Sequence, residues 1–143
     1  MEREKRTEMR LEMDSLSENE EFARVVVAVF LSRLNPTLEE LDDVKTAVSE
    51  AVTNAVIHGY GGGPGTIFIR AAVDGQEFTV EVRDDGVGIG DVARAMEPMF
   101  TTDTAGERSG MGFSFMEAFM DQVEVISAPG QGTRVIMKKR IGA

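Results

Sequence analysis

The feature of this 143-residue chain that most constrains its fold is a long helical pattern over residues 37–60. A helix with a single apolar stripe buries that stripe against another layer of the protein. Thr37 and Glu40 have the spacing of a capping box, so the sequence predicts that the helix begins at Thr37. The apolar positions recur every three or four residues, and they are Leu38, Leu41, Val44, Val48, Ala51, Val52 and Ala55.

A different face of the same helix carries three polar side chains. Glu50, Asn54 and His58 are each four residues apart, so they form a column along the helix. A carboxylate in such a place can take a proton from a nucleophile, and a carboxamide oxygen can ligate a hard cation such as Mg²⁺. On spacing alone a solvated helix surface explains the column better. The functional interpretation depends on the glycine motifs further along the chain.

The patterns on both sides of this helix predict one domain that contains helices and strands. The charged residues 1–8 are predicted to be flexible or to begin an edge strand. The other predicted elements are a strand at 9–13, a helix at 22–34 opened by a Ser17/Glu20 capping box, a hairpin of strands 66–73 and 77–83 that turns at Asp74-Gly75, helices at 91–96 and 113–120, and closing strands at 123–127 and 133–139.

The predicted helix at 22–34 has more apolar residues than one buried face needs. Either both sides of the helix are buried within the domain, or one side meets another protein chain, and the sequence favours neither. Arg24 is a charge inside this apolar helix. It is a candidate partner-binding residue, and an equally good interpretation is that it only faces solvent.

The first glycine motif, Asp84-x-Gly86-x-Gly88, directly follows a predicted strand. Glycines at this spacing let the backbone turn tightly and approach a ligand without a Cβ in the way. A carboxylate at the strand end can accept a hydrogen bond from an exocyclic amine such as that of adenine. A plain strand-to-loop turn uses the same residue types, so the motif alone leaves both interpretations open. The earlier glycine run at 59–65 is predicted only to end the helix and form a connector.

The second glycine motif, Gly110-x-Gly112, precedes the predicted helix at 113–120. Backbone N–H groups and the helix dipole at such a start favour a polyphosphate. Arg108 and Ser109 stand just before it and could offer a cation and a hydroxyl to the same phosphates. The polar residues before them lack periodicity, which is typical of a loop or lid, here placed at 97–109.

Composition excludes several classes of protein. The formal net charge is −10, which argues against direct binding of nucleic acid. There is no cysteine, so a disulfide framework and thiolate chemistry are excluded. No apolar run approaches the length of a membrane span and no signal-peptide core is found, so we expect a cytoplasmic protein without membrane contact.

Together the separated motifs resemble, in order, the N, G1 and G2 boxes of the GHKL ATPase/kinase superfamily: Glu50-x-x-x-Asn54, Asp84-x-Gly86-x-Gly88 and Gly110-x-Gly112. Gly132-Thr133 resembles the late Gly-Thr of that superfamily. Residues 49–60, 82–89 and 108–113 look very like the anti-sigma serine kinases, and the resemblance covers about residues 9–140. It implies one domain over residues 1–143 with an α/β (α+β) two-layer sandwich of the Bergerat type, whose sheet is mixed and mostly antiparallel.

The resemblance also implies a role for individual residues. Glu50 would be the catalytic base or would position the attacking hydroxyl, and Asn54 would ligate Mg²⁺. Asp84 would bind the adenine amino group with help from Thr133. The remaining ATP-binding positions would be Gly86, Gly88, Thr101, Arg108, Ser109, Gly110 and Gly112. The resemblance gives no role to His58, which is more simply a core or helix-terminal histidine.

The activity implied is that of an anti-sigma factor and serine/threonine protein kinase. Such a protein holds a sporulation sigma factor, sigma F, and uses Mg-ATP to phosphorylate a serine of a STAS-type anti-anti-sigma protein. The resemblance also implies a homodimer. Histidine kinases carry their phosphoacceptor on a preceding helical hairpin, and no segment before Met9 fits one. Two alternatives stay open: a general-stress anti-sigma kinase, and a nucleotide-gated binding module with little catalysis.

Overall fold

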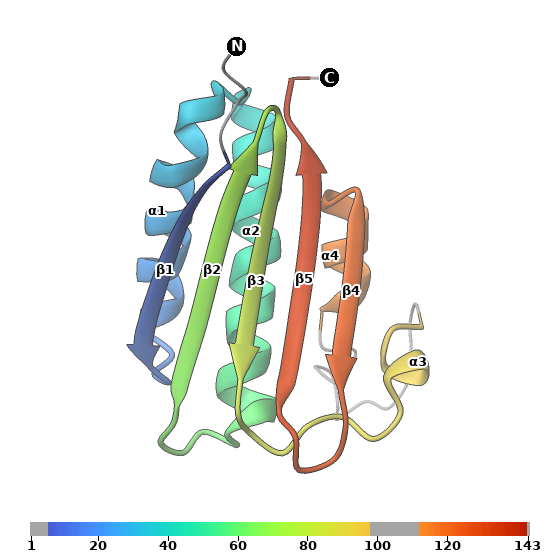
Figure 1. Cartoon of the computed structure of the whole chain (residues 1–143). Coiled ribbons are helices and arrows are strands. Elements are labelled where there is room, and N and C mark those ends of the chain that lie inside the picture. The colour runs from blue at the N-terminus through green and yellow to red at the C-terminus, as the bar shows by residue number, and fades with distance from the viewer. Residues whose placement is uncertain (1–5, 98–111, 143) are drawn as a thin grey trace.

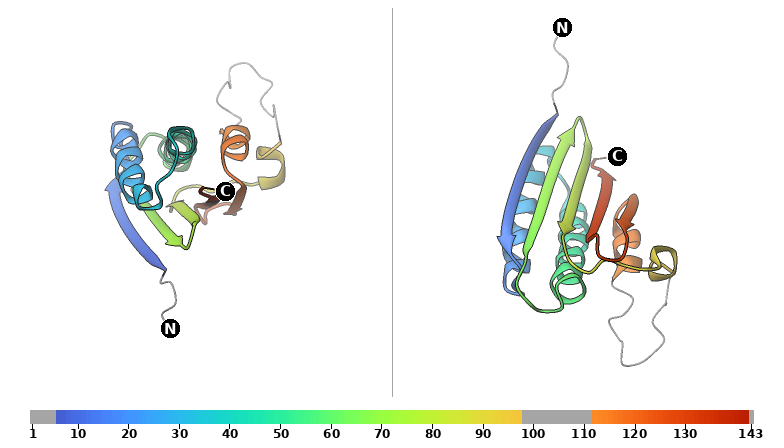
Figure 2. Two further views of the ribbon diagram at one scale, coloured as in Figure 1. Left: turned by 90° about the horizontal axis from the view of Figure 1, so that it is seen from above. Right: turned by 60° about the horizontal axis from the view of Figure 1, so that its bottom comes forward.

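The computed structural model describes residues 6–97 and 112–142, in which helices cover one face of a single sheet (Figures 1 and 2). The strands are β1 (Thr7–Asp14), β2 (Thr66–Asp74), β3 (Glu77–Asp84), β4 (Gln122–Ser127) and β5 (Thr133–Arg140). The helices are α1 (Asn19–Leu31), α2 (Leu38–Asn54), α3 (Val92–Ala95) and α4 (Phe113–Phe119), with a 3₁₀ turn η1 (Ser32–Leu34) and a π-helical turn η2 (Ala55–Gly59). The predicted two-layer α/β sandwich is confirmed.

The sheet has the order β1-β2-β3-β5-β4, and all four pairings of the described strands are antiparallel. The family resemblance implied a mixed sheet, and this sheet has no parallel pair within the described residues. The predicted hairpin is present as β2 and β3, with Gly75 at φ +65° in its turn. β1 begins at Thr7, so the end of the charged run belongs to an edge strand.

Helix α2 lies between α1 and α4 and packs its apolar stripe on the sheet (Figure 2). Its start is the predicted capping box: Glu40 N–H donates to Thr37 Oγ1 at 3.0 Å, and Thr37 N–H donates to Glu40 Oε1 at 2.9 Å. The buried residues of this helix are Val44, Ala47, Val48, Ala51 and Val52, whereas Leu38, the first residue of the predicted stripe, is exposed. The stripe therefore holds α2 rigidly against the sheet, and the other face of the helix is left for polar groups.

The capping box predicted at Ser17 and Glu20 is wrong. Helix α1 begins without a side-chain cap, and the Asn19 amide donates to the Asp14 carbonyl instead. The Glu20 carboxylate accepts a hydrogen bond from Ser49 on α2, so it is not free to turn back to the helix start. A contact between two helices thus replaces the local cap.

Helix α1 is buried on one side only. Its buried residues are Ala23, Val27, Phe30 and Leu31. The opposite side exposes an apolar stripe at Phe22, Val25 and Val29, with exposed fractions of 52%, 51% and 68%. Burial of both sides within the domain, one of the two accounts left open by the sequence, is therefore wrong.

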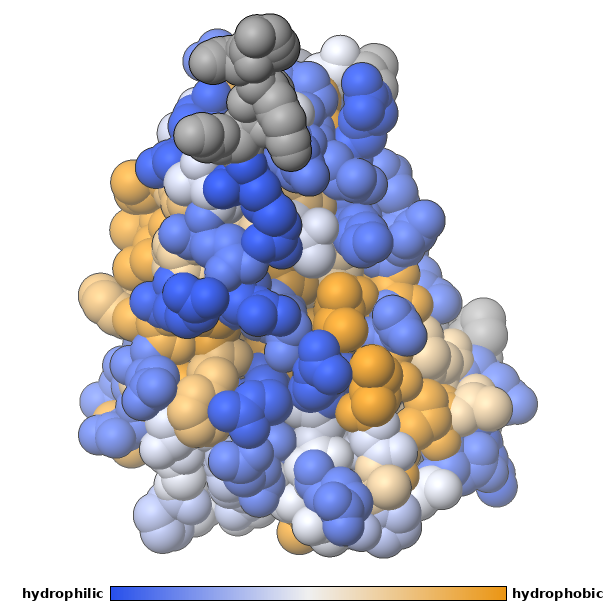
Figure 3. Space-filling model, viewed as in Figure 1, coloured by the Kyte–Doolittle hydropathy of each residue, from blue (hydrophilic) through white to orange (hydrophobic). Residues whose placement is uncertain are grey.

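The sheet face that the helices do not cover carries many charged side chains (Figure 3). Glu81 forms ion pairs with Arg70 at 3.2 Å and Arg134 at 3.0 Å, on the two neighbouring strands. These arginines lower the pKa of Glu81 against the opposing effect of its burial. Arg83 stacks over the Phe68 ring at 3.9 Å. Cross-strand pairs of this kind stabilise the open face and keep it hydrophilic.

Candidate active site

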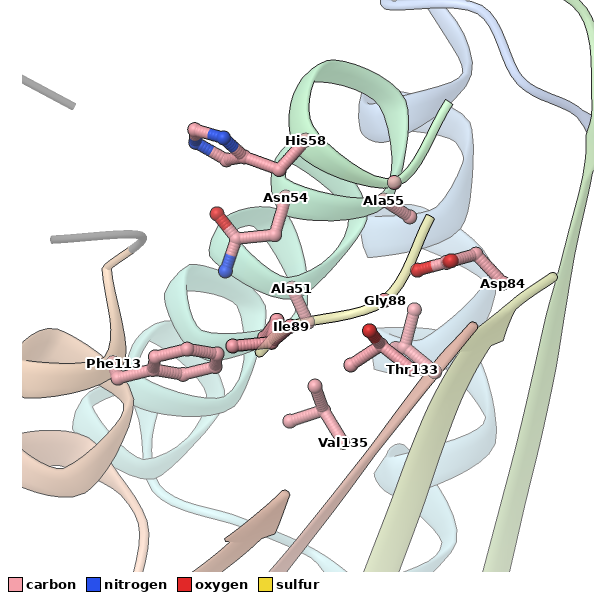
Figure 4. Close-up of a pocket in the computed structure, with 12 residues that line it drawn as sticks. Ala51, Asn54, Ala55, His58, Asp84, Gly88, Ile89, Phe113, Thr133 and Val135 are labelled. Carbon is pink, nitrogen blue, oxygen red and sulfur yellow. The ribbon is translucent and has the colours of Figure 1, made fainter. Parts of the chain in front are cut away.

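A small hollow, open to solvent, lies between the C-terminal part of α2, the end of β3, the start of β5 and the loop after β3 (Figure 4). Its floor is apolar, and Asn54, His58, Asp84 and Thr133 bring polar groups to it. The complete lining is Ala51, Asn54, Ala55, His58, Gly59, Val82, Asp84, Gly88, Ile89, Phe113, Thr133 and Val135. An apolar cavity with a few convergent polar groups is the usual form of a small-molecule site.

Asp84 is the buried acceptor of this pocket. It ends β3 and is only 5% exposed, and its Oδ1 accepts a hydrogen bond from Gly86 N–H at 2.9 Å. Burial raises the pKa of Asp84 above its usual value of 3.8; the negative charge of Asp85 acts in the same direction, and backbone hydrogen bonds from Gly86 and Thr133 oppose the rise. A buried carboxylate with free lone pairs favours a ligand that offers a hydrogen-bond donor.

The end of α2 is shaped to leave room for that carboxylate. Tyr60 N–H donates to the Ala55 carbonyl at 3.0 Å, which closes the wider π-helical turn η2. A Cβ at Gly59 would lie 2.7 Å from Asp84 Cγ, so a side chain there would displace the carboxylate. π-Helical turns often occur at functional sites. From the sequence, Gly59 was predicted only to end the helix.

The glycines of the first motif pack backbone against backbone. A Cβ at Gly86 would lie 1.9 Å from the Gly59 carbonyl oxygen, and one at Gly88 would lie 2.0 Å from the Ala128 carbonyl oxygen. Val87 N–H donates to the Gly59 carbonyl at 3.0 Å, and its own carbonyl accepts from Gly130 N–H at 2.7 Å. Gly88 lines the pocket. Close backbone packing is therefore a second reason for glycine at both positions, besides the expected close approach of a ligand.

Glu50 and Gly112 come together although they belong to different motifs. A Cβ at Gly112 would lie 2.2 Å from Glu50 Oε1, so the carboxylate rests directly on the glycine at the start of α4. Gly112 has φ +68°, a conformation that favours glycine. The next residue, Phe113, is buried and lines the pocket. The structure therefore brings the carboxylate of α2 to the edge of the hollow that faces α4.

Asn54 and His58 project from the same side of the helix (Figure 4). Both line the pocket, and His58 lies in η2, at the helix terminus as the sequence predicted. The sequence did not lead us to predict that His58 lines the pocket, although its position four residues after Asn54 on the same helix indicated it. Within residues 6–97 and 112–142 no group of three or more His, Cys, Asp or Glu residues could hold a metal ion. Asn54 offers a carboxamide oxygen, a ligand type that Mg²⁺ accepts.

The described residues of the pocket do not include every candidate residue. Thr101, Arg108, Ser109 and Gly110, and all of the proposed lid except Glu97, are outside the described residues. Arg24 is on α1, away from the pocket, and pairs with Glu20 at 3.7 Å and Glu21 at 3.8 Å. In the described part of the chain, no helix has the length and apolar character needed to cross a membrane.

Asp84→Asn is expected to lose ATP affinity by about 10- to 100-fold, because a hydrogen bond to a charged group is removed. It is also expected to stabilise the fold at neutral pH. The folded protein holds the Asp84 proton more tightly than the unfolded chain, so wild-type stability falls as pH rises from 3.8 through the raised pKa. The gain over wild type should shrink on acidification, as measured by urea unfolding across pH.

The matched control for this prediction is Asp42→Asn, which changes an exposed carboxylate on α2 that does not line the pocket. It should leave ATP affinity and the free energy of unfolding within about 0.5 kcal/mol of wild type. An Asp84→Asn variant that binds ATP normally, or whose stability tracks wild type at every pH, would contradict the assignment of Asp84 as the buried acceptor.

The comparisons with known proteins agree with this fold. The family Histidine kinase-like ATPase domain matches residues 14–139. The Anti-sigma F factor of Clostridium acetobutylicum is 56% identical over 132 residues, which are 92% of each chain. Those of Thermoanaerobacter sp. and Halalkalibacterium halodurans are 55% and 51% identical, each over at least 94% of both chains. The chain therefore belongs to the histidine kinase-like ATPase domain family and, within it, to the family of anti-sigma F factors.

Solved structures show the same fold at low sequence identity. The crystal structure of the RsbU and RsbW domains of a Mycobacterium tuberculosis protein superimposes with a TM-score of 0.68 at 20% identity, covering 94% of this chain and 32% of that one. The catalytic domain of the histidine kinase ThkA has a TM-score of 0.56 at 18% identity, covering 93% of this chain and 96% of that one. These similarities establish the fold alone.

Proposed function

We propose that this protein is an anti-sigma factor and a Mg-ATP-dependent serine/threonine protein kinase of the cytoplasm. It would hold a sporulation sigma factor, sigma F, and phosphorylate a serine of a STAS-type anti-anti-sigma protein. The observation that carries the kinase part is the contact of Glu50 with Gly112 at the edge of a pocket whose opposite side holds the buried Asp84. The names of the relatives support the anti-sigma part.

The pocket residues fit a nucleotide. Asp84 and Thr133 offer acceptors for the amino group of a base, and the apolar floor suits the faces of its ring. Asn54 stands one helical turn, about 6 Å, before His58 and the same distance after Glu50. The catalytic carboxylate and the metal-ligating amide would thus lie one turn apart on α2. The four lid-side residues, Thr101, Arg108, Ser109 and Gly110, would complete the phosphate side.

In the proposed reaction the partner's serine hydroxyl attacks the γ-phosphorus in line. Glu50 orients the hydroxyl and accepts its proton while the new oxygen–phosphorus bond forms. The bond between the γ-phosphorus and the bridging oxygen breaks, and ADP leaves with that electron pair. Asn54 would hold Mg²⁺, whose charge offsets that of the phosphates. Because catalysis of this kind rests on positioning, a rigid helix is a suitable carrier for both residues.

ATP and ADP would act as a switch between the partners. A nucleotide shifts a binding equilibrium only if it has different affinities for the two complexes. The proposed lid at 97–109 stands between α3 and α4 in the sequence, and Gly112 at the start of α4 contacts Glu50. The γ-phosphate is the group by which the two nucleotides differ, and it would lie near Glu50. We therefore expect sigma-factor affinity to depend on which nucleotide is present.

Helix α1 supplies the proposed protein contact, both for a partner and for a homodimer. Its exposed apolar stripe at Phe22, Val25 and Val29 lies on one side of the helix, and a cation, Arg24, lies on another side beside Glu20. The Arg24 side chain is 33% exposed, and its Nε is buried without a hydrogen-bond partner. A partner carboxylate could bind the exposed part of the guanidinium.

Arg24→Glu is expected to weaken binding of the sigma factor and the STAS-type protein by about tenfold or more, because it places like charges together. ATP affinity should not change. Arg24→Gln, which adds no repulsion with Glu20, should have a smaller effect in the same direction. Arg10→Glu on the open sheet face is the charge-matched control. Titration calorimetry that finds both partners bound as tightly by Arg24→Glu as by wild type would remove Arg24 from the interface.

A further inference from the structure

Ser127 forms a hydrogen-bonded junction beside the proposed adenine end of the pocket. It is the last residue of β4 and pairs in register with Thr133 on β5. Its hydroxyl oxygen lies 2.8 Å from Ile89 N, 2.7 Å from the Gly132 carbonyl oxygen and 2.8 Å from Thr133 Oγ1. The residue thus joins the loop after β3 to the strand that carries Thr133, and the mechanism above does not use it.

The number of hydrogens at this junction fixes the direction of each hydrogen bond. Ile89 N–H can only donate and the Gly132 carbonyl can only accept, while each hydroxyl has one hydrogen. All three contacts are hydrogen bonds only if Ser127 donates to Gly132 and accepts from Ile89 and Thr133. The hydrogen of Thr133 then points to Ser127. The lone pairs of Thr133 Oγ1 are not used at this junction, so Thr133 presents an acceptor to the pocket.

We propose that Ser127 is a specificity-determining positioning residue that fixes the Thr133 hydroxyl as an acceptor. This inference rests on the proposed nucleotide site. Asp84, the neighbour of Thr133 across β3 and β5, also presents an acceptor (Figure 4). Two acceptors side by side bind a base with an exocyclic amino group, such as adenine. They repel a base with a carbonyl oxygen at that position, such as hypoxanthine or guanine.

The test compares the Mg²⁺-dependent affinities for ATP and for inosine triphosphate, which carries a carbonyl oxygen in place of the adenine amino group. We expect wild type to prefer ATP by about 100-fold or more. In Ser127→Ala the Thr133 hydroxyl is free to rotate and donate to the carbonyl oxygen, so the preference should fall about tenfold. Ser127→Thr keeps the hydroxyl, so its preference for ATP should equal that of wild type. Ser32→Ala, which removes a similar hydroxyl in η1, is the control.

A double variant separates this role from a merely structural one. In a Thr133→Val background, Ser127→Ala should leave the ratio of the two affinities unchanged, because Ser127 acts through the Thr133 hydroxyl. If Ser127→Ala does not fold, Ser127→Cys takes its place, and its ratio should lie between wild type and Thr133→Val. The inference would be overturned if Ser127→Ala alone left the ratio of ATP to inosine triphosphate affinity unchanged. It would also be overturned if Ser127→Ala lowered that ratio equally in the wild-type and Thr133→Val backgrounds. A wild-type chain that binds neither nucleotide would instead overturn the proposed function on which it rests.

Discussion

Glu50→Gln is expected to bind Mg-ATP with nearly wild-type affinity and to transfer phosphate to a STAS-type protein about 100- to 10,000-fold more slowly. Glutamine keeps the size of the side chain against Gly112 and can still donate and accept hydrogen bonds. It cannot take the proton from a serine hydroxyl. Binding would therefore survive and catalysis would not. The measurement is single-turnover transfer of label from γ-labelled ATP, beside calorimetric nucleotide binding.

The control for this experiment is Glu39→Gln, on the first turn of the same helix and away from the pocket. It should transfer phosphate at the wild-type rate. Glu50→Ala should resemble Glu50→Gln, although it also leaves space beside Gly112. If Glu50→Gln transferred phosphate normally, Glu50 would have no part in the chemistry, and a carboxylate of the partner would become the better candidate for the base.

Gly86→Ala is expected to lower the free energy of unfolding by about 3 kcal/mol and to abolish nucleotide binding. The new Cβ would lie 1.9 Å from the Gly59 carbonyl oxygen, and a backbone atom cannot move aside as the end of a flexible side chain can. The loop after β3 and the end of α2 would have to separate. Because Gly59 also adjoins Asp84, the buried acceptor would shift with them. Urea unfolding and ATP titration measure the two effects.

Gly90→Ala is the matched control in the same loop. A Cβ there would meet nothing within 4 Å, and Gly90 is not among the glycines with positive φ. It should therefore change the free energy of unfolding by no more than about 0.5 kcal/mol. If Gly86→Ala were as stable as Gly90→Ala, the close backbone packing of the first glycine motif would not be needed for the fold.

Local patterns predicted much of the fold because several elements are specified by neighbours in sequence. The apolar stripe and capping box of α2, and the Asp-Gly turn between β2 and β3, involve residues a few positions apart. The Ser17 cap failed for the opposite reason. Glu20 has a better partner in Ser49, a residue on another helix, and no local rule can foresee a contact of that range.

In the candidate site, too, local patterns could be predicted from the sequence and long-range contacts could not. The column of Glu50, Asn54 and His58 followed from helical spacing, and the acceptor Asp84 followed from its place after a strand. The contacts between these motifs could not be predicted. Gly59 against Asp84 and Gly112 against Glu50 join segments far apart in sequence, and they depend on how α2 lies on the sheet and beside α4. Ser127 was missed because its three partners meet only once β4 and β5 are paired.

The measurement that tests the central claim most directly is phosphotransfer to serine. The chain would be incubated with γ-labelled ATP, Mg²⁺ and a STAS-type anti-anti-sigma protein, beside a partner variant in which the candidate serine is replaced by alanine. We predict Mg²⁺-dependent label on a serine of the wild-type partner and none on the alanine variant. ATP binding without transfer to the partner would contradict the kinase assignment, and would leave a nucleotide-gated protein that only binds its sigma factor.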